Sequence, residues 1–137
     1  MPRDTRTGSV LEEMILPALR RGGYAVRTQV RIGERLGGGS HIVDAIAEKG
    51  GQHFLLSLKW QQVSGTAEQK VPFEIISLSQ ALEHGIHQKA YLVLGGEGWT
   101  LRGFYVGGGL DRYLKQAERV EIITLENFVA KANQGGL

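Results

Sequence analysis

The sequence predicts an α/β fold in which a central mixed β-sheet is flanked by helices. Three observations support this. Apolar residues recur at helical spacing near the start, in the middle and at the end of the chain, and stretches of strand length lie between them. The order is one helix, three strands, one helix, one strand and then mixed elements. The 137 residues, 42% of them hydrophobic, are enough for one core, so we expect a single domain over residues 1–137.

The composition narrows the class of protein. The chain contains no cysteine, which excludes disulfides and zinc sites built on thiolates. It has no apolar run long enough to span a membrane, and its first residues lack the hydrophobic segment of a secretory signal. We therefore expect a cytoplasmic protein with no membrane partner. The net charge of +2 permits a polyanionic partner, and seven arginines fall within the first 35 residues.

The first part of the chain is predicted to form a basic arm, a helix and a strand. Residues 1–8 are expected to be a flexible arm. Ser9 then caps a helix over residues 10–21, which has acidic residues in its first turn and two glycines after its end. Pro17 is expected to kink this helix or to shift its start. Residues 24–32 alternate in polarity and predict a strand with one wet face.

Two more strands follow a glycine-rich segment. Residues 33–41 form either a flexible loop whose backbone can approach a ligand closely or simply a long hairpin turn. Strands are predicted over residues 41–47 and 53–60, and the turn between them has the composition of a hairpin.

Proline, glycine and capping residues divide the rest of the chain. Residues 61–70 are polar and predict a loop, after which Pro72 opens a helix that Gly85 ends. The remaining elements are expected to be a strand over 89–94, a strand or loop over 101–109, a short helix over 110–117, a strand over 120–124 and a closing helix over 125–134 capped by Thr124.

Two of the predicted strands carry a charged residue within an apolar run. In the strand over residues 53–60, Phe54, Leu56, Leu58 and Trp60 share one face, and the other face carries Lys59 between small polar groups. A lysine at such a position is paired, solvated or functional. Asp44 interrupts the neighbouring strand in the same way, with the opposite charge.

An acid and a cation on adjacent strands suit the cleavage of a phosphodiester bond. Mg²⁺ prefers oxygen ligands and retains several waters, so one to three carboxylates suffice to bind it. We predict that Asp44 is a metal ligand and that Lys59 stabilises charge and positions the attacking water. The alternative is an Asp–Lys ion pair between the strands, which contributes little to stability compared with apolar residues of the same volume.

The spacing of Asp44, Ser57 and Lys59 resembles the PD-(D/E)XK nuclease superfamily, which implies a restriction-endonuclease-like core. The stretch GSVLEEMILPALRRGGYAV is similar to the opening of archaeal-type Holliday junction resolvases, and the resemblance extends over roughly residues 8–62. It implies that Glu12 joins the metal site and that Ser40 contributes to it.

The chain departs from the family motif at Ser57, where a glutamate is normal. Some restriction-type members with a serine here recover the acid from the following helix, which implies Glu74 or alternatively Glu68 in this chain. Gln61 resembles a glutamine that orients water or phosphate in several branches, although it is also compatible with a polar residue at the sheet edge. His41 is either a second acid/base group or an ordinary surface residue.

The resemblance implies a Holliday junction resolving endonuclease in DNA recombination, which acts on branched double-stranded DNA as a homodimer with Mg²⁺, for which Mn²⁺ substitutes. Cations are expected to bind the DNA phosphates without reading sequence, namely Arg3, Arg6, Arg27, Arg31, Arg35 and Lys70. The alternatives are a restriction-type or homing endonuclease on the same core and a DNA-binding module whose catalytic site has decayed.

Overall fold

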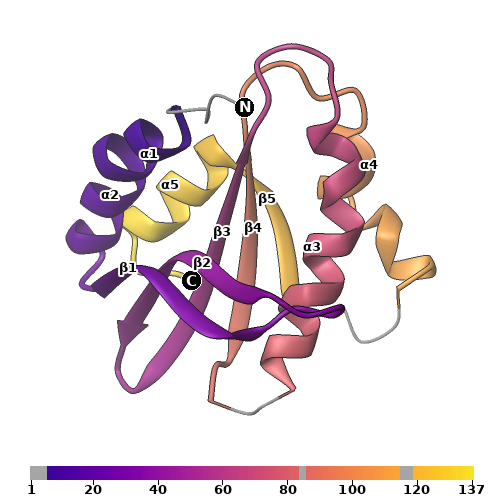
Figure 1. Ribbon diagram of the computed structural model, residues 1–137. Coiled ribbons are helices and arrows are strands. Elements are labelled where there is room, and N and C mark those ends of the chain that lie inside the picture. Colours follow the sequence, from indigo (N-terminus) through magenta and orange to yellow (C-terminus); the bar gives the residue numbers. More distant parts are fainter. Residues whose placement is uncertain (1–5, 84–85, 115–118) are drawn as a thin grey trace.

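A five-stranded mixed sheet lies between two layers of helices in the computed structural model, which describes residues 6–83, 86–114 and 119–137 (Figure 1). The strands follow one another in sheet order; the first three are antiparallel, and β3, β4 and β5 are parallel. They are β1 (Ala25–Glu34), β2 (Ser40–Lys49), β3 (Gln52–Trp60), β4 (Lys89–Gly95) and β5 (Val120–Thr124). The predicted α/β fold with a helix-flanked mixed sheet is confirmed.

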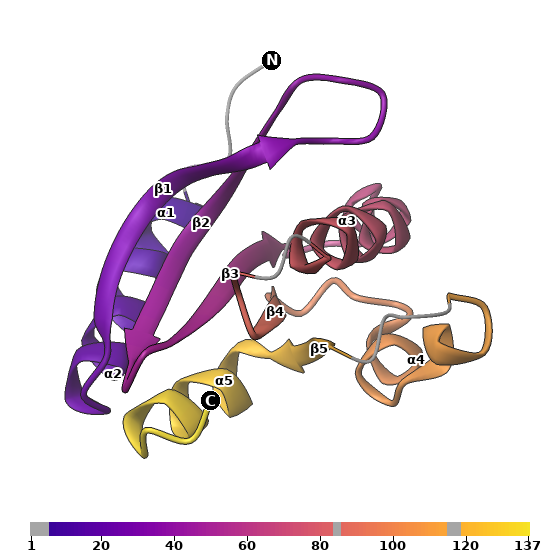
Figure 2. The same ribbon diagram turned by 90° about the horizontal axis from the view of Figure 1, so that it is seen from below.

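The helices cover both faces of this sheet (Figures 1 and 2). The N-terminal helical segment and the C-terminal helix lie on one face, and the central helix with two short turns lies on the other. The elements are α1 (Arg6–Val10), the π-helical turn η1 (Leu11–Ile15), α2 (Leu16–Arg21), α3 (Ala67–Leu82), α4 (Arg102–Val106), the 3₁₀ turn η2 (Gly109–Arg112) and α5 (Leu125–Asn133). None of the helices in these described ranges is long and apolar enough to cross a membrane.

Strand β3 separates two hydrophobic cores. Phe54, Leu56 and Leu58 point into the core beneath α2 and α5, and Trp60 packs against that core. Leu55 points the other way, into the core beneath α3. The predicted alternation along this strand is confirmed, and it places Ser57 and Lys59 on the face toward α3.

The N-terminal helix begins earlier than predicted. It starts at Arg6, so Ser9 lies within α1 and is not its N-cap, and residues 6–8 of the expected arm are helical; residues 1–5 lie outside the described range. The π-helical turn ends at Ile15, two residues before Pro17, which has no N–H to donate to the preceding turn. The helix ends at Gly22 and Gly23 as predicted, with Gly23 at a φ of 90°.

Both predicted hairpins are present. The glycines at 37–39 all have positive φ and form the turn between β1 and β2, which is the hairpin alternative for this segment. Gly50 and Gly51 also have positive φ and close the tighter turn between β2 and β3.

The central helix begins before its proline. Pro72 lies inside α3, which starts at Ala67, so the prediction that Pro72 opens this helix is wrong. The proline cannot donate to the Glu68 carbonyl four residues earlier, and the Tyr105 hydroxyl donates to that carbonyl instead, at 2.8 Å. The helix ends at Leu82, and the predicted stop at Gly85 lies outside the described residues.

The last third differs from the prediction in two elements. The segment over 101–109 contains the helix α4 and is neither a strand nor a loop throughout. Of the predicted short helix over 110–117, residues 110–112 lie in the 3₁₀ turn η2, residues 113 and 114 are not helical, and residues 115–118 lie outside the described range. Strand β5 and helix α5 are confirmed, and the Thr124 hydroxyl accepts a hydrogen bond from the Asn127 N–H at 3.3 Å as the predicted cap.

Candidate active site

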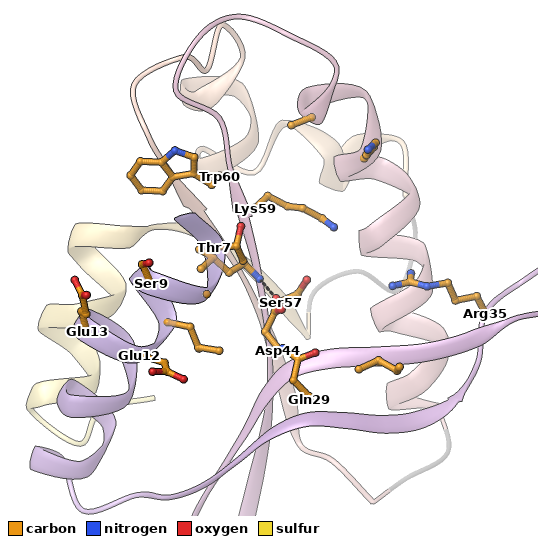
Figure 3. Close-up of a pocket in the computed structure, with 16 residues that line it drawn as sticks. Thr7, Ser9, Glu12, Glu13, Gln29, Arg35, Asp44, Ser57, Lys59 and Trp60 are labelled. Atoms are coloured by element: carbon orange, nitrogen blue, oxygen red, sulfur yellow. Dashed lines mark hydrogen bonds between the residues drawn. The ribbon is translucent and has the colours of Figure 1, made fainter. Parts of the chain in front are cut away.

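A cleft of about 1080 Å³ opens between the N-terminal helical segment, strands β1 to β3 and the start of α3 (Figure 3). Residues far apart in the sequence meet in it. Four predicted catalytic residues line the cleft together: Glu12, Asp44, Ser57 and Lys59. The cleft also contains two of the predicted DNA-binding cations, Arg35 and Lys70.

Asp44 lies where β2 and β3 separate. The paired register of these strands runs only as far as Ala45 and Leu56. Two residues further along β3, the Leu58 N–H has no partner in that ladder, and it donates to Asp44 Oδ2 at 2.6 Å. This hydrogen bond fixes one oxygen of the carboxylate at the side of the cleft (Figure 3).

Glu74 lies behind the cleft and is surrounded by donors. Its carboxylate accepts hydrogen bonds from Arg35 Nη1 at 3.1 Å and from the Ser57 hydroxyl at 3.3 Å. Lys59 Nζ lies 3.8 Å away and His41 Nε2 lies 3.5 Å away. Helix α3 thus places an acid directly against Ser57, the position where the family motif normally has its own carboxylate.

The charge of Glu74 is set by two opposing effects. Burial on its own raises the pKa of this carboxyl, because water no longer solvates the charged form. The neighbouring His41 and the positive charges of Lys59 and Arg35 outweigh burial and lower the pKa to about 2. Glu74 is therefore ionised at neutral pH, and it holds both cations at the edge of the cleft.

Lys59 extends from β3 toward α3, as Figure 3 shows. About 28% of its side chain is exposed, so the ammonium group faces both Glu74 and the cleft. The ion pair with Glu74 joins β3 to α3, whereas the alternative considered from the sequence was a pair with Asp44 on the neighbouring strand.

Glu12 stands on the opposite wall from α3. It lies in the π-helical turn, is exposed, and faces the cleft that also contains Asp44. Two carboxylates on one cleft fit the donor set of Mg²⁺, which binds one or two protein carboxylates and keeps several waters. Within residues 6–83, 86–114 and 119–137, no group of three His, Asp or Glu side chains forms a complete metal site, so the donor set does not suit a cation enclosed by protein ligands.

Two other polar residues singled out in the sequence, Gln61 and Ser40, do not line the cleft. Gln61 is buried beneath it and connects three segments: its Nε2 donates to Glu68 at 3.1 Å and to the Gly98 carbonyl at 2.8 Å, and its Oε1 accepts from the Ala67 N–H at 3.0 Å. Ser40 is exposed at the start of β2, and its hydroxyl accepts from Arg31 at 3.2 Å. These contacts give both side chains a structural role in addition to the predicted catalytic one.

Burial and hydrogen bonds bear on two alternatives that the sequence left open. His41 is almost completely buried, so the surface alternative for this residue is wrong. Glu68 accepts from Gln61 and from the backbone N–H groups of Thr100 and Leu101. It therefore anchors the segment before α4, and Glu74 is the acid that approaches Ser57.

The predicted DNA-binding cations fall in two places. Arg35 and Lys70 line the cleft, and Arg27 and Arg31 are exposed on the edge strand β1. Arg3 lies outside the described residues, and for Arg6 the structure describes only its backbone in α1. The cleft also contains Gln29, which the sequence did not indicate because an irregular backbone within an alternating strand leaves no pattern.

Comparison with known proteins supports the same fold and family. The model of the PD-(D/E)XK nuclease superfamily domain matches residues 3–135. A crystal structure of a protein of unknown function, AF1548, is similar with a TM-score of 0.52 and 12% sequence identity, over 81% of this chain and 54% of that one. This chain thus corresponds to about half of that protein. No curated protein matches the sequence significantly. The chain belongs to the PD-(D/E)XK nuclease superfamily.

Proposed function

We propose that this protein is a metal-dependent endodeoxyribonuclease that resolves four-way DNA junctions. The observation that carries the proposal is the meeting of Glu12, Asp44 and Lys59 in one open cleft. An acid from the N-terminal helical segment, an acid from β2 and an ammonium group from β3 line the same cleft. This combination suits phosphodiester hydrolysis, in which negative charge builds up on the phosphate.

Glu12 and Asp44 are the residues that would hold Mg²⁺, and Mn²⁺ is expected to substitute. The bound cation supplies Lewis-acid polarisation of the phosphate and lowers the pKa of a bound water. Lys59 places its ammonium group where charge develops on the phosphate and helps to position the attacking water. Asp44 accepts from the Leu58 N–H, which orients its carboxylate before substrate arrives.

Ser57 and Glu74 together take the place of the single carboxylate of the family motif in this proposal. Glu74 is ionised and lies within hydrogen-bonding distance of the Ser57 hydroxyl. Two cations now share its charge, namely Arg35 and Lys59. In our proposal Arg35 moves to a DNA phosphate on binding, which leaves Glu74 to orient Lys59 and to serve as a third oxygen donor to the metal site.

A junction is the substrate class that we infer from the distribution of charge. In this proposal the exposed arginines of β1 and the cations that line the cleft bind phosphates, which carry no sequence information. Symmetrical cleavage of two strands requires two related sites, so we propose a homodimer. A restriction-type activity is expected to need a further surface that reads base edges.

The test is incubation of the purified protein with a labelled four-way junction and with its linear duplex arms, in Mg²⁺ and in EDTA. The proposal predicts Mg²⁺-dependent nicks in the junction and none in the arms. Equal cleavage of junction and arms at a defined sequence would support the restriction-type alternative. Absence of any cleavage in Mg²⁺ or Mn²⁺ would contradict the proposal that the protein is a nuclease.

One observation favours a second candidate, a DNA-binding module without cleavage. Glu74, the acid that approaches Ser57, already forms ion pairs with Arg35 and Lys59. The described part of the chain holds no complete metal site. Under this candidate, Asp44→Asn leaves DNA affinity unchanged in the presence and absence of Mg²⁺. Under the nuclease proposal, the same variant loses cleavage, and Mg²⁺ no longer strengthens junction binding.

A further inference from the structure

Gln29 has a backbone conformation that is unfavourable for its residue type. Its φ is +52°, and among the residues that the structure describes it is the only one other than glycine with a positive φ. In the left-handed region the Cβ atom crowds the backbone; glycine avoids this crowding, and asparagine and aspartate tolerate it better than glutamine. A residue other than glycine in such a conformation beside a cleft suggests that its side chain has a function.

The position of Gln29 is opposite Asp44. In the ladder between β1 and β2, Thr28 pairs with Ala45 and Val30 pairs with Val43, so the residue between them on each strand faces the other. Gln29 and Asp44 both line the cleft, and Figure 3 shows both at the β1–β2 ribbon. The unfavourable backbone therefore lies across the ladder from the predicted metal ligand.

The side chains of β2 also switch from one face of the sheet to the other at this point. Val43 packs in the core beneath α3, whereas Ala45 packs in the core beneath α2 and α5. In a regular strand, residues two apart lie on the same face. The reversal at Asp44 and the irregular backbone at Gln29 occur at the same level of the ladder, and together they bring both side chains to the cleft.

We propose that the carboxamide of Gln29 is a phosphate-binding group, which donates a hydrogen bond to a non-bridging oxygen of the DNA phosphate next to Asp44. This inference rests on the proposed nuclease function. A carboxamide offers two N–H donors and carries no charge. It can therefore bind phosphate beside a carboxylate, whereas a lysine or arginine at this position would form an ion pair with Asp44.

A purely structural role for the irregular backbone at Gln29 makes a different prediction. An irregular backbone bends an edge strand and protects it from pairing with other chains, and β1 is such a strand. That role needs only the backbone, and glycine would fill it with less crowding. Replacement of Gln29 by glycine therefore separates the two roles, because it keeps the conformation and removes the carboxamide.

The experiment compares the wild type with Gln29→Gly, Gln29→Asn and Gln29→Met in Mg²⁺-dependent junction cleavage and in thermal unfolding. Gln52→Ala is the control, because it removes an exposed glutamine at the far end of β3, outside the cleft. For Gln29→Gly we expect an equal or higher Tm, a KM increased about tenfold and a kcat changed less than about twofold, since an equally strong contact in substrate and transition state affects KM alone. Gln29→Asn, which retains the amide, is expected to recover part of the lost affinity.

The outcomes separate this inference from the proposed function. A wild type that neither binds nor cleaves the junction contradicts the proposed function and the inference with it. An active wild type with an unchanged KM in both Gln29→Gly and Gln29→Met contradicts the inference alone and leaves the structural role of the irregular backbone. Gln29→Met has a side chain of similar length and no charge but lacks the N–H donors, so its raised KM supports the inference even if the glycine variant folds poorly.

Discussion

Glu74 keeps a negative charge in a place where burial opposes one. Its side chain is 6% exposed, yet Arg35, Lys59 and the Ser57 hydroxyl all contact its carboxylate. A buried charge of this kind is stable only with its partners, and the loss of one member leaves the others unpaired. Glu74 therefore affects both the stability of the protein and the position of Lys59 in the cleft.

The pKa of Glu74 predicts how stability depends on pH. Its folded value of about 2 lies below its ordinary value of 4.5, so the charged form stabilises the fold above pH 4.5. That contribution, about 3 kcal/mol, is lost as the pH falls from 4.5 toward 2. We predict that Glu74→Gln lowers the free energy of unfolding at pH 7 by about 2–3 kcal/mol. The deficit relative to the wild type shrinks below pH 4.5.

Urea unfolding between pH 7 and pH 2 measures this difference. Glu97→Gln, which changes an exposed acid in the loop after β4, is the matched control and should follow the wild type throughout. A Glu74→Gln deficit that stays constant from pH 7 to pH 2 would mean that the charge of Glu74 does not stabilise the fold.

Some of the candidate site could be predicted from single residues, and some could not. Asp44 and Lys59 stand out because a charge within an apolar strand requires an explanation, and both line the cleft. Gln61 has the same alternation as Lys59, but it lies where β3 has ended and the chain passes under the loop before α4. The alternation along a strand predicts the face on which a side chain lies, but not which segment covers that face. The buried contacts of Gln61 were therefore not predictable.

Helix α3 contains a proline, and a segment distant in the sequence supplies the hydrogen bond that the proline cannot donate. Pro72 leaves the Glu68 carbonyl without its helical donor, and Tyr105 from α4 supplies the hydrogen bond at 2.8 Å. Burial, followed by the nearby charge of Glu68, raises the pKa of Tyr105, so its hydroxyl stays a donor over a wider range of alkaline pH than an exposed tyrosine. The tertiary contact thus compensates for a local defect.

This contact can be tested with a double-mutant cycle. Tyr105→Phe removes the donor and is expected to lower the free energy of unfolding by about 1–2 kcal/mol, because the carbonyl is left buried and unpaired. Pro72→Ala restores the helical N–H, so Tyr105→Phe in that background should cost less. Urea unfolding of the four proteins gives the coupling energy, and additive effects would show that Tyr105 does not act through this carbonyl.

Proline also explains why the start of α3 was predicted wrongly. Proline is favoured in the first turn of a helix, which is why Pro72 was read as its beginning. Helix α3 extends one turn further back because Tyr105, more than 30 residues later, satisfies the carbonyl. The N-terminal helix was likewise predicted too short, since Ser9 resembles a cap but lies inside α1. Strands were predicted more accurately, because their alternation reflects the two cores directly.

At the scale of the whole molecule, positive charge is spread over the cleft and the edge strand. Arg31 is exposed on β1, and its Nε donates to Ser40 at 3.2 Å, which holds the guanidinium along the ribbon. A phosphate contact releases counterions from DNA, so its loss reduces the dependence of binding on salt. We predict that Arg31→Ala lowers the slope of log K against log salt concentration by about 1, equally for all DNA sequences.

Fluorescence anisotropy with a labelled junction at several salt concentrations measures this slope. Arg112→Ala is the matched control, because Arg112 is exposed in η2 and does not line the cleft. An unchanged slope for Arg31→Ala would place the DNA away from β1.

The family was recognisable from residues that the fold brings together. The acid of β2, the lysine of β3 and the glutamate of the N-terminal helix are distant in sequence but line one cleft, and the superfamily model matches residues 3–135. The choice of substrate was not derivable in the same way, because it depends on surfaces and assemblies rather than on a motif.

The most direct test of the account is the single-turnover rate of junction cleavage by the wild type and by Asp44→Asn in Mg²⁺, with junction affinity measured in parallel. Asp111→Asn, an exposed acid outside the cleft, is the control. We predict a rate at least about a hundredfold lower for Asp44→Asn, with the affinity measured without metal changed less than about twofold. Cleavage by Asp44→Asn at the wild-type rate would contradict the claim that this cleft is the active site.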